Sequence, residues 1–362
     1  MKKFNIGIVG ATGTVGQNYI RLLQNHPWFE IIDVAASPRS AGKKYKEAVK
    51  AKWQMPIPIP NKIKDLLVRD AQDFEKIPEN LDFVFSAINM PTKEQIKELE
   101  IAYAKRGYPV ISNNSAHRWT PDVPMIIGEI NHDHANVIPI QQKNRNFAKG
   151  FIIVKPNCSL QSYLTPIFAL EQVGYKVSKL IITTLQAVSG AGYPGVPSLD
   201  MIDNIVPYIG GEEEKTEREP LKILGKIGDS GIENYNNLQI SATCTRVPVT
   251  DGHTASVNMK FQDKIPTKEK VIEIWKNFRS IPQELNLPLA PKQPIIYLES
   301  IDRPQPYKDR DNDKGMAITV GRLREDNVFD YKFVSLSHNT IRGAAGGAIL
   351  NAELLVVKGF IK

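Results

Sequence analysis

The sequence predicts an α/β protein of two domains, in which a parallel sheet flanked by helices is followed by a mixed, largely antiparallel sheet. A chain of 362 residues is longer than one typical hydrophobic core requires. Its first third alternates short apolar runs with helical patterns, which is the βαβ rhythm of a parallel sheet. In the second half, strand patterns follow one another more closely. We therefore expect an α/β domain and then an α+β domain.

The first strand, Phe4–Val9, leads through a glycine-rich turn into a helix over Val15–Gln24. Gly10 and Gly13 allow a tight turn and a close approach of the backbone to a pyrophosphate, and Gly16 allows the helix to pack closely on the strand. Because the pattern begins at the first strand and opens a helix, it favours a Rossmann-type dinucleotide site over a plain turn. The candidate cofactor-binding residues here are Gly10, Thr12, Gly13, Thr14 and Val15.

The second strand, Glu30–Ala36, indicates which dinucleotide is bound. NAD-specific folds place an acid at the end of this strand to bind the ribose 2′-hydroxyl, and no acid stands there. Ser37, Arg39 and Ser40 are instead available for a 2′-phosphate, which favours NADP. The alternative for Arg39 is an ordinary solvated loop charge.

Two further strands, over Leu81–Ala87 and Pro109–Ser112, enclose a helix over Thr92–Arg106. This arrangement continues the parallel sheet. Ser86 lies near the end of its strand, on the edge of the sheet where ligands bind in such folds. It is therefore a candidate cofactor contact.

A polar segment, residues 112–118, follows the strand that ends at Ser112. It is expected in the same crevice. Arg118 could bind an anion there, and His117 could equally be a structural hydrogen-bonding residue.

Cys158 falls where an extended run, Phe151–Val154, gives way to a helical pattern. Unpaired N–H groups and the positive end of a helix dipole lower the pKa of a thiol at such a place, and the thiolate is the nucleophile. Asn157 can cap the helix. The alternative is a small, inert buried side chain, the usual fate of a free cysteine.

The second half is predicted to contain strands over Lys179–Gln186, Leu238–Val249, Thr254–Phe261, Met316–Leu323 and Val328–Leu336, and helices from Gly210, over Lys268–Phe278 and over Asn339–Val357. The second and third of these strands look like neighbours joined by the turn before His253. The proline-rich segment 282–314 is expected to be a long loop or an inter-subunit arm. The last helix is expected to return to the first domain, which gives residues 1–157 with 339–362 as one domain and 158–338 as the other.

Composition excludes several classes of protein. The net charge of +7 permits anionic partners, but basic residues are interleaved with acids, and no stretch shows the basic, aromatic patch of a nucleic-acid surface. No apolar run approaches 18 residues, and no room remains for a signal peptide before the first strand. Two cysteines fit a reducing cytoplasm and, with few histidines, make a zinc cluster unlikely. We expect a cytoplasmic protein with no metal, and phosphorylated small molecules as the anions.

A cysteine, a histidine, an arginine and a nicotinamide site together indicate interconversion of an aldehyde and an acyl group through a thioester. The thiolate attacks the aldehyde, hydride leaves to NADP⁺, and the thioester then transfers its acyl group to phosphate or another acceptor. Cysteine suits this because it is strongly nucleophilic, and a histidine can carry the hydroxyl proton.

The chain resembles the aspartate-semialdehyde dehydrogenase family, in its archaeal and fungal branch, over nearly the whole length. The segments that carry the resemblance are GIVGATGTVGQ, SNNSAHR, PNCS, LQAVSGAGYPGVPSLDMIDNIVPYIGGEEEK, CTRVPVTDGH, DRPQP, GMAITVGRLR and NTIRGAAGGAILNAELL. Several are long and specific, so the resemblance is strong.

The resemblance implies a role for each matching residue. Cys158 matches the nucleophile, His253 the acid/base, and Gln186 the glutamine that orients the substrate. Arg246 matches the arginine that pairs with the substrate carboxylate, for which a planar guanidinium is suited. The other residues implied to bind substrate or phosphate are Glu212, Lys215, Arg118 and Asn157. Ser189 and Gly190 are implied to bind the cofactor, and Asn339 is implied beside its nicotinamide amide.

The resemblance also implies a reaction and an assembly. The reaction is the reversible, NADP-dependent, phosphorylating oxidation of L-aspartate 4-semialdehyde to 4-aspartyl phosphate, run reductively in cells towards lysine, threonine and methionine. Such enzymes are homodimers or homotetramers joined through the second domain. Neither a nucleic acid nor a membrane is implied as a partner.

The chain departs from the family pattern next to the thiol. Lys155 stands where an asparagine is usual, and residues 160–163 are larger than in relatives. A lysine there could stabilise the thiolate or point to solvent. These departures leave malonyl-CoA or succinyl-CoA reductase, on the same scaffold, as the alternative activity. A catalytically silent NADP-binding sensor, or a dehydrogenase for another semialdehyde such as N-acetylglutamyl semialdehyde, would explain less of the pattern.

Overall fold

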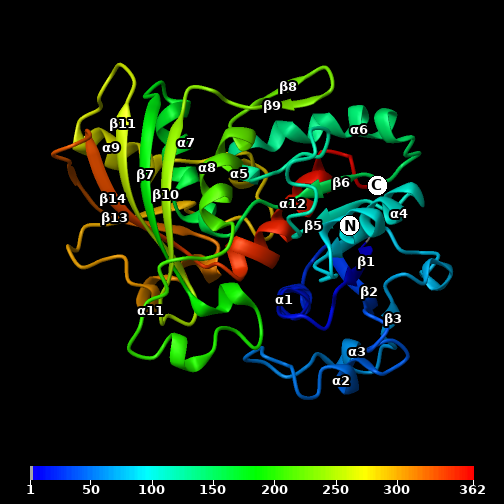
Figure 1. Cartoon of the computed structure of the whole chain (residues 1–362). Coiled ribbons are helices and arrows are strands. Elements are labelled where there is room, and N and C mark those ends of the chain that lie inside the picture. The colour runs from blue at the N-terminus through cyan, green and yellow to red at the C-terminus, as the bar shows by residue number, and fades with distance from the viewer. Residues whose placement is uncertain (1–2) are drawn as a thin grey trace.

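The computed structural model describes residues 3–362 and places one six-stranded sheet in each half of the molecule (Figure 1). The first sheet is entirely parallel, in the order β3-β2-β1-β4-β5-β6. Its strands are β1 (Phe4–Val9), β2 (Phe29–Ala36), β3 (Arg69–Asp70), β4 (Phe83–Ser86), β5 (Val110–Ser112) and β6 (Ile152–Val154). The strand order reverses between β1 and β4, the switch point where ligands bind in Rossmann-type sheets.

Helices cover both faces of this sheet, as the βαβ rhythm predicts. Ile8 of β1 and Phe85 of β4 share a buried cluster with residues of α1 (Thr14–Leu23) and α12 (Gly346–Val357). Val84 points to the other face and belongs to a cluster that includes α4 (Lys93–Lys105). Alternate residues of each strand therefore face opposite helix layers.

The glycine-rich turn has the geometry that its spacing predicts. Gly10 has φ +93°, and a Cβ there would lie 2.5 Å from the backbone of Ala87. A Cβ at Gly16 would lie 2.3 Å from the Gly10 oxygen, so only glycine lets α1 pack this closely on β1.

The second sheet is mixed, in the order β10-β7-β11-β14-β13-β12. The three central pairings are antiparallel and the two outer ones are parallel. Its strands are β7 (Val177–Gln186), β10 (Gln239–Arg246), β11 (His253–Phe261), β12 (Ile295–Leu298), β13 (Ile318–Glu325) and β14 (Tyr331–Ser337).

Two expectations about this half are wrong. The strands β10 and β11 are not neighbours, because β7 lies between them and pairs with both. The segment 282–314 is not only a loop, since it contains the edge strand β12 and the short helix α11 (Pro306–Asp309). Strand pairing is decided by contacts distant in sequence, which a local pattern does not reveal.

One face of the second sheet is covered and the other is open. Helices α7 (Leu164–Gln172) and α9 (Lys268–Asn277) pack on the covered face, where Ile182 and Trp275 are fully buried. On the opposite face of β7, Ile181 is 44% exposed and Leu185 is 37% exposed.

The final helical pattern returns to the first domain, as expected, but it is not one regular helix. A π-type turn over Ile341–Ala345 precedes α12, and Ala344 has the non-helical angles φ −140° and ψ −107°. Residues of α12 then pack into the core of the first sheet. The predicted domain boundaries at 157 and 339 stay a prediction.

Short elements that the sequence patterns did not indicate complete the fold. They are α2 (Tyr45–Ala48), α3 (Asn61–Lys64), α5 (Gly128–Asn131), α6 (Ile138–Arg145), α10 (Ile281–Glu284), β8 (Lys226–Gly228) and β9 (Gly231–Glu233). The remaining helix, α8 (Glu212–Ile223), begins close to where its acidic residues predict. Within residues 3–362, no helix is both long enough and apolar enough to cross a membrane.

Candidate active site

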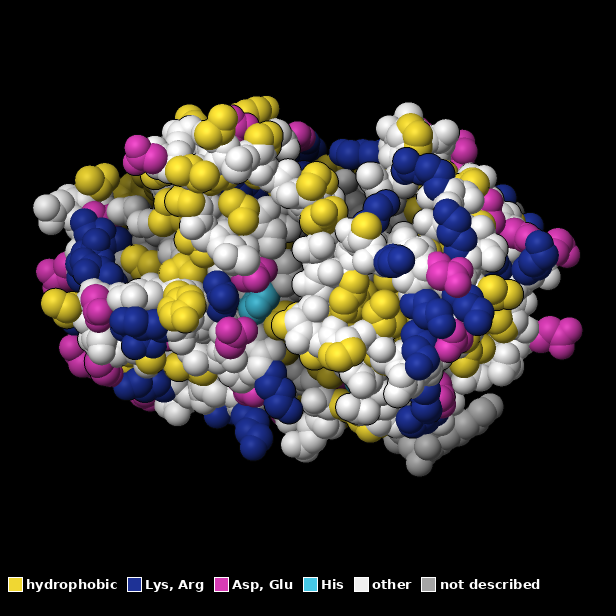
Figure 2. All heavy atoms as spheres, turned by 90° about the horizontal axis from the view of Figure 1, so that it is seen from below, with side chains coloured by type: hydrophobic (Ala, Val, Ile, Leu, Met, Phe, Trp, Pro, Cys, Tyr) yellow, Lys and Arg dark blue, Asp and Glu magenta, His cyan; other side chains and the backbone are white. Residues whose placement is uncertain are grey.

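Three adjacent strands deliver the polar residues of the candidate site to one edge of the second sheet. Gln186 ends β7 and lies opposite Arg246, which ends the parallel strand β10. His253 begins β11, the antiparallel partner of β7, and so lies at the same edge. Cys158 follows β6 of the first sheet by four residues. The space-filling view shows a furrow between the two halves, with a histidine and several Lys or Arg side chains along it (Figure 2).

Cys158 sits against the C-terminal segment. A Cβ at Gly343 would lie 2.9 Å from the Cys158 Cβ, so this glycine makes room for the cysteine. Burial, and next Glu212, raise the pKa of the Cys158 thiol to about 11, against the opposing effects of Lys155, Arg118 and Arg246.

The expectation that the strand–helix junction lowers this pKa is therefore wrong. The helix that follows begins as a single 3₁₀ turn, Ser159–Ser162, and α7 starts only at Leu164. Such a short turn aligns few peptide dipoles, and burial is the largest influence on the thiol.

Asn157 closes the turn that carries the thiol. Its side-chain oxygen accepts hydrogen bonds from the Ser159 N–H at 2.8 Å and from the Ser159 hydroxyl at 2.6 Å, much as a helix cap does. Its side-chain amide donates to both oxygens of Glu212, at 3.0 and 2.9 Å. The oxygen and the amide of the Asn157 side chain are thus both hydrogen-bonded to other protein groups, and these bonds fix the turn that carries Cys158.

Glu212 is the centre of a polar network beneath the site. Besides Asn157, it accepts a hydrogen bond from Gln186 Nε2 at 3.3 Å and pairs with Lys215 at 2.7 Å. Burial acts to raise the pKa of Glu212, but Lys215, Asn157 and Gln186 together outweigh burial and lower it. Glu212 is therefore a fixed negative charge near the thiol, which favours binding of a cationic group.

His253 is buried, and its ring has a defined role. Its Nδ1 accepts a hydrogen bond from the Ala187 N–H at 3.1 Å, which assigns the proton of the neutral ring to Nε2. Burial, and then Arg246, lower the pKa of His253 to about 3. Among residues 3–362, Nε2 has no hydrogen-bond partner, so its N–H can donate to an oxygen of a bound substrate.

Arg246 carries a charge that has no ion-pair partner among residues 3–362. Its Nη1 donates to the Ala187 carbonyl at 2.8 Å. A Cβ at Gly190 would lie 2.7 Å from this Nη1 and 3.1 Å from the His253 Cε1, so glycine is needed for the loop to lie over both side chains. A buried, unpaired guanidinium of this kind suits an anionic substrate.

Arg118 is placed differently from the free anion-binding residue that the sequence suggests. Its Nη1 pairs with Glu219 at 2.8 Å, and Glu219 also accepts the Asn157 N–H at 2.6 Å. Sequence reasoning missed Glu219. It lies seven residues after Glu212 on α8, which is the helical spacing for one face, so its position could have been inferred.

The predicted cofactor residues lie at the carboxyl edge of the first sheet and across the furrow. A Cβ at Gly13 would meet nothing closer than the Gly10 oxygen at 3.6 Å, so this glycine leaves open surface in front of the α1 N-terminus. That space and the unpaired N–H groups of a helix start fit a pyrophosphate. Thr14 accepts a hydrogen bond from the Tyr193 N–H at 3.2 Å, which joins this turn to the second half.

Two of the predicted cofactor residues, Asn339 and Ser189, are hydrogen-bonded to each other and to the turn before His253. Asn339 accepts the Gly252 N–H at 2.8 Å and donates to the Ser189 hydroxyl at 2.9 Å. Because Gly252 precedes His253, these bonds hold the Gly-rich loop and the histidine in one unit.

The residues predicted around the adenosine end of the cofactor differ in whether their side chains already have partners within the protein. Arg39 is exposed and forms no ion pair within residues 3–362, while Ser37 and Ser40 shape its turn through a 2.9 Å backbone bond. Ser86, in contrast, donates its hydroxyl to buried Glu100 at 2.7 Å. Its side chain is committed there, and its contact with a cofactor stays a prediction.

Comparison with known proteins follows the same division of the chain. Residues 5–138 match the domain family described as semialdehyde dehydrogenase, NAD binding domain, and residues 164–342 match semialdehyde dehydrogenase, dimerisation domain. An aspartate-semialdehyde dehydrogenase of Schizosaccharomyces pombe is 44% identical, with 98% of this chain and 99% of the relative covered. The chain belongs to the aspartate-semialdehyde dehydrogenase family.

Fungal and archaeal members of this family resemble the chain, as the sequence suggested. The Methanothermobacter thermautotrophicus relative is 44% identical over 97% of this chain and 98% of its own length. A crystal structure of the Candida albicans aspartate-semialdehyde dehydrogenase with NADP superposes with a TM-score of 0.89 at 38% identity, covering 99% of this chain and 100% of that one. The predicted family and fold are confirmed.

Proposed function

We propose that the protein catalyses the reversible, NADP-dependent, phosphorylating oxidation of L-aspartate 4-semialdehyde to 4-aspartyl phosphate. The observation that supports it best is the meeting of Cys158, Gln186, Arg246 and His253 at one sheet edge in a chain of this family. Those groups supply a nucleophile, an orienting amide, a carboxylate-binding cation and a proton donor.

The covalent steps take place on Cys158. Its thiolate adds to the aldehyde carbon, the carbonyl π bond breaks, and the oxygen takes a proton to give a thiohemiacetal. Bound NADP⁺ would accept the hydride that leaves this carbon. The hydroxyl releases its proton to water as the C=O bond re-forms, and a thioester remains. Phosphate then attacks the thioester carbonyl and the thiol departs, which yields the acyl phosphate. In the reductive direction, the Nε2–H of His253 donates to the oxygen that gains charge when hydride arrives.

The substrate is oriented by charges on either side of the thiol. Arg246 binds the α-carboxylate as a bidentate partner. Glu212, kept ionised by Lys215, faces the ammonium group, and Gln186 positions the reacting carbonyl. Lys215 and Arg118 are the cations we propose for phosphate, and each of them also pairs with a carboxylate, Glu212 and Glu219 respectively.

The cofactor is NADP, and the Gly-rich turn before α1 is its pyrophosphate site. The free guanidinium of Arg39, flanked by serine hydroxyls, is suited to the 2′-phosphate. The Candida albicans relative, which has the same fold, was crystallised with this cofactor.

The protein forms a homo-oligomer, in keeping with its dimerisation domain. We place the contact on the open face of the second sheet and expect a dimer or tetramer. Both cysteines are unpaired, which fits a reducing cytoplasm.

A purified-enzyme assay tests the activity. NADPH oxidation should occur with 4-aspartyl phosphate and should not occur with malonyl-CoA or succinyl-CoA; the opposite pattern would establish an acyl-CoA reductase instead. Cys158→Ala should abolish turnover while NADP affinity stays within about twofold, because the thiol lies outside the pyrophosphate turn. Retained turnover would remove Cys158 from the chemistry.

A further inference from the structure

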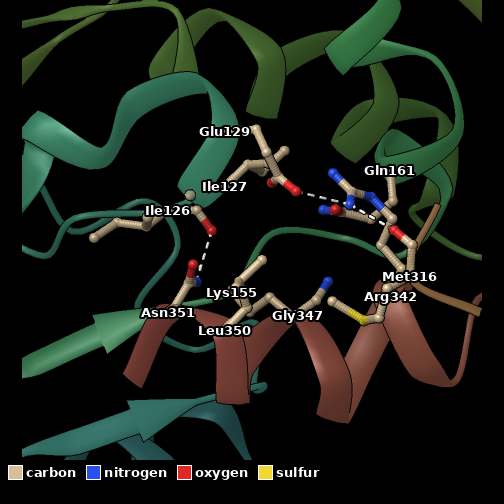
Figure 3. A pocket seen from close by; sticks show the side chains of 11 residues that line it. Ile126, Ile127, Glu129, Lys155, Gln161, Met316, Arg342, Gly347, Leu350 and Asn351 are labelled. Atoms are coloured by element: carbon tan, nitrogen blue, oxygen red, sulfur yellow. Dashed lines mark hydrogen bonds and ion pairs between the residues drawn. The ribbon is translucent and has the colours of Figure 1, made fainter. Parts of the chain in front are cut away.

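Two lysines among residues 3–362 are buried, Lys155 and Lys222, and their surroundings differ. Lys155 is 2% exposed, so the expectation that it could point to solvent is wrong. It lines a small cavity beside α12 (Figure 3), and its Nζ donates one hydrogen bond, to the Pro156 carbonyl at 3.2 Å. Lys222, the penultimate residue of α8, has a full set of hydrogen bonds instead, and its partners lie next to the candidate site.

The ammonium group of Lys222 is surrounded by carbonyl groups of one short segment, residues 118–123. Its Nζ donates to the carbonyl oxygens of Arg118 at 2.8 Å, Thr120 at 2.7 Å and Val123 at 2.8 Å, which uses all three of its donors. Burial lowers the pKa of Lys222 to about 8, so the group is charged at pH 7. It forms no ion pair within residues 3–362, and the three carbonyl dipoles offset the cost of burying it. The segment is therefore fixed around the lysine.

This contact joins the two parts of the chain that form the site. Segment 118–123 lies in the region that matches the NAD binding domain, whereas Lys222 lies in the region that matches the dimerisation domain. Asp122, the acid within the segment, does not neutralise the lysine, because it pairs with Arg145 at 2.7 Å. Lys222 thus holds the segment through its backbone and not through a salt bridge.

Arg118, at the start of the segment, is held by α8 at both ends. Its carbonyl accepts a hydrogen bond from Lys222, and its Nη1 pairs with Glu219, one turn earlier on the helix. Its Nη2 donates to the Asn113 carbonyl at 3.3 Å, and its Nε has no hydrogen-bond partner in the part of the chain that the structure describes. The guanidinium is fixed in place while donor capacity remains for an anion.

One side of α8 contacts both Arg118 and the turn that carries the thiol. Glu212 and Glu219 receive hydrogen bonds from Asn157, the residue before Cys158. Lys222 follows Glu219 by three residues, which places it on the same side of the helix. A phosphate that attacks a thioester on Cys158 needs a defined position and direction. A cation that binds this phosphate must therefore keep a fixed position relative to the thiol, and α8 holds both.

We propose that Lys222 is a positioning residue, which holds the backbone of Arg118 so that its guanidinium binds phosphate beside the thioester of Cys158. The proposal deepens the proposed function and rests on it. Lys222 acts through Arg118 and does not touch the substrate, because its three donors are used within the protein. The semialdehyde is bound by Arg246 at the edge of the second sheet, so its binding does not depend on Lys222.

The test is the dependence of semialdehyde oxidation on inorganic phosphate at pH 7. Lys222→Met keeps the length of the side chain but removes the charge and the donors. In this variant the KM for phosphate should rise about tenfold, while the KM for the semialdehyde stays within about twofold. A merely structural role would reduce the amount of active enzyme, which lowers kcat and leaves both KM values unchanged. That result, or an equal rise in both KM values, would overturn the proposal.

A double-mutant cycle shows whether Lys222 acts through Arg118. Arg118→Ala should raise the KM for phosphate at least as much as Lys222→Met does, and the two changes together should raise it no further than Arg118→Ala alone. Independent, additive effects would mean that Lys222 acts by another route. Lys222→Gln, which keeps two donors, should give a smaller rise, and it takes the place of the methionine variant in the cycle if that variant folds poorly.

Arg218 provides a matched control on the same helix. Its guanidinium lies 4.7 Å from the centre of the Trp119 ring, so it contacts the same segment from the exposed side. Arg218→Gln should leave the KM for phosphate unchanged, and a rise as large as that of Lys222→Met would contradict a specific role for the lysine.

Failure of the proposed function would look different. A native protein whose oxidation of the semialdehyde does not depend on phosphate would refute the reaction and the role of Lys222 together. A native protein with a measurable KM for phosphate, shared by the Lys222 variants, would refute the role of Lys222 alone.

Discussion

At the scale of single residues, His253 links the chemistry of the site to the stability of the fold. The Ala187 N–H donates to Nδ1 of the buried neutral ring, and the Nε2–H, which has no partner among the described residues, can donate to a substrate oxygen. Its pKa is lowered to about 3 in the folded protein, against about 6.5 when unfolded. The unfolded chain therefore binds more protons than the folded one between these values. The contribution of His253 to the free energy of unfolding is therefore fully present above about pH 6.5 and is lost as the pH falls towards 3.

This linkage gives a prediction for acid conditions. At pH 5, His253 should lower the free energy of unfolding by about 2 kcal/mol relative to pH 7. His253→Asn cannot take up the proton, so in this variant the difference in the free energy of unfolding between pH 7 and pH 5 should be smaller by that amount. His117, whose pKa burial lowers to about 4, supplies a second contribution that remains in the variant. Denaturant unfolding at a series of pH values measures the free energy of unfolding of the native protein and of the variant. If that free energy depends on pH identically in the two proteins, the lowered pKa of His253 is contradicted.

At the scale of elements, α8 organises the site from one face. Glu212 and Glu219 lie two turns apart and receive hydrogen bonds from Asn157, while Glu219 also pairs with Arg118. The opposite side of the helix is solvated, and Glu214 pairs there with Arg218.

The two faces of α8 predict different costs for the same substitution. Glu219→Gln leaves buried Arg118 without a counter-charge and should lower the free energy of unfolding by about 1–3 kcal/mol. Glu214→Gln, whose side chain is 60% exposed, should change it by no more than about 0.5 kcal/mol. Urea unfolding of both variants gives the comparison. Equal costs would mean that the buried pair contributes nothing beyond an exposed one.

Individual strands and helices could be predicted from the sequence, but which elements pair or pack together in space was harder to predict. The strand over Phe4–Val9, the turn glycines and the helix from Thr92 follow from periodicity and turn chemistry, which act within a few residues. The insertion of β7 between β10 and β11 depends on pairing between segments far apart in the chain. The burial of Lys155 likewise depends on α12, which arrives some 190 residues later in the sequence.

The same distinction applies to the candidate site. The sequence singles out Cys158 by its place between a strand and a helix, and Gln186, Arg246 and His253 by the long family segments that contain them; their roles stay predictions. The sequence did not predict their ionisation states, because burial, which depends on the folded structure, is the largest influence on the pKa values of Cys158 and His253.

At the scale of the whole molecule, the open face of the second sheet is the feature that a single chain leaves unfinished. The opposite face is covered by α7 and α9, whereas Ile181 and Leu185 on β7 project from the open face. A sheet with an exposed apolar face is commonly completed by a partner, and the dimerisation domain spans this region. In a twofold contact, each substitution is introduced twice across the interface.

Ile181→Lys should therefore dissociate the oligomer, because it buries a charge on each side of a symmetric contact without a partner. Light scattering coupled to size-exclusion chromatography should show the mass fall to that of one chain. Val173→Lys adds the same charge at an exposed residue at the end of α7, on the covered side of the sheet, and should leave the mass unchanged. If Ile181→Lys keeps the native mass, the partner sits elsewhere on the second half. The exposed side chains Leu199, Ile202 and Tyr208 of the loop before α8 would then be the next surface to substitute.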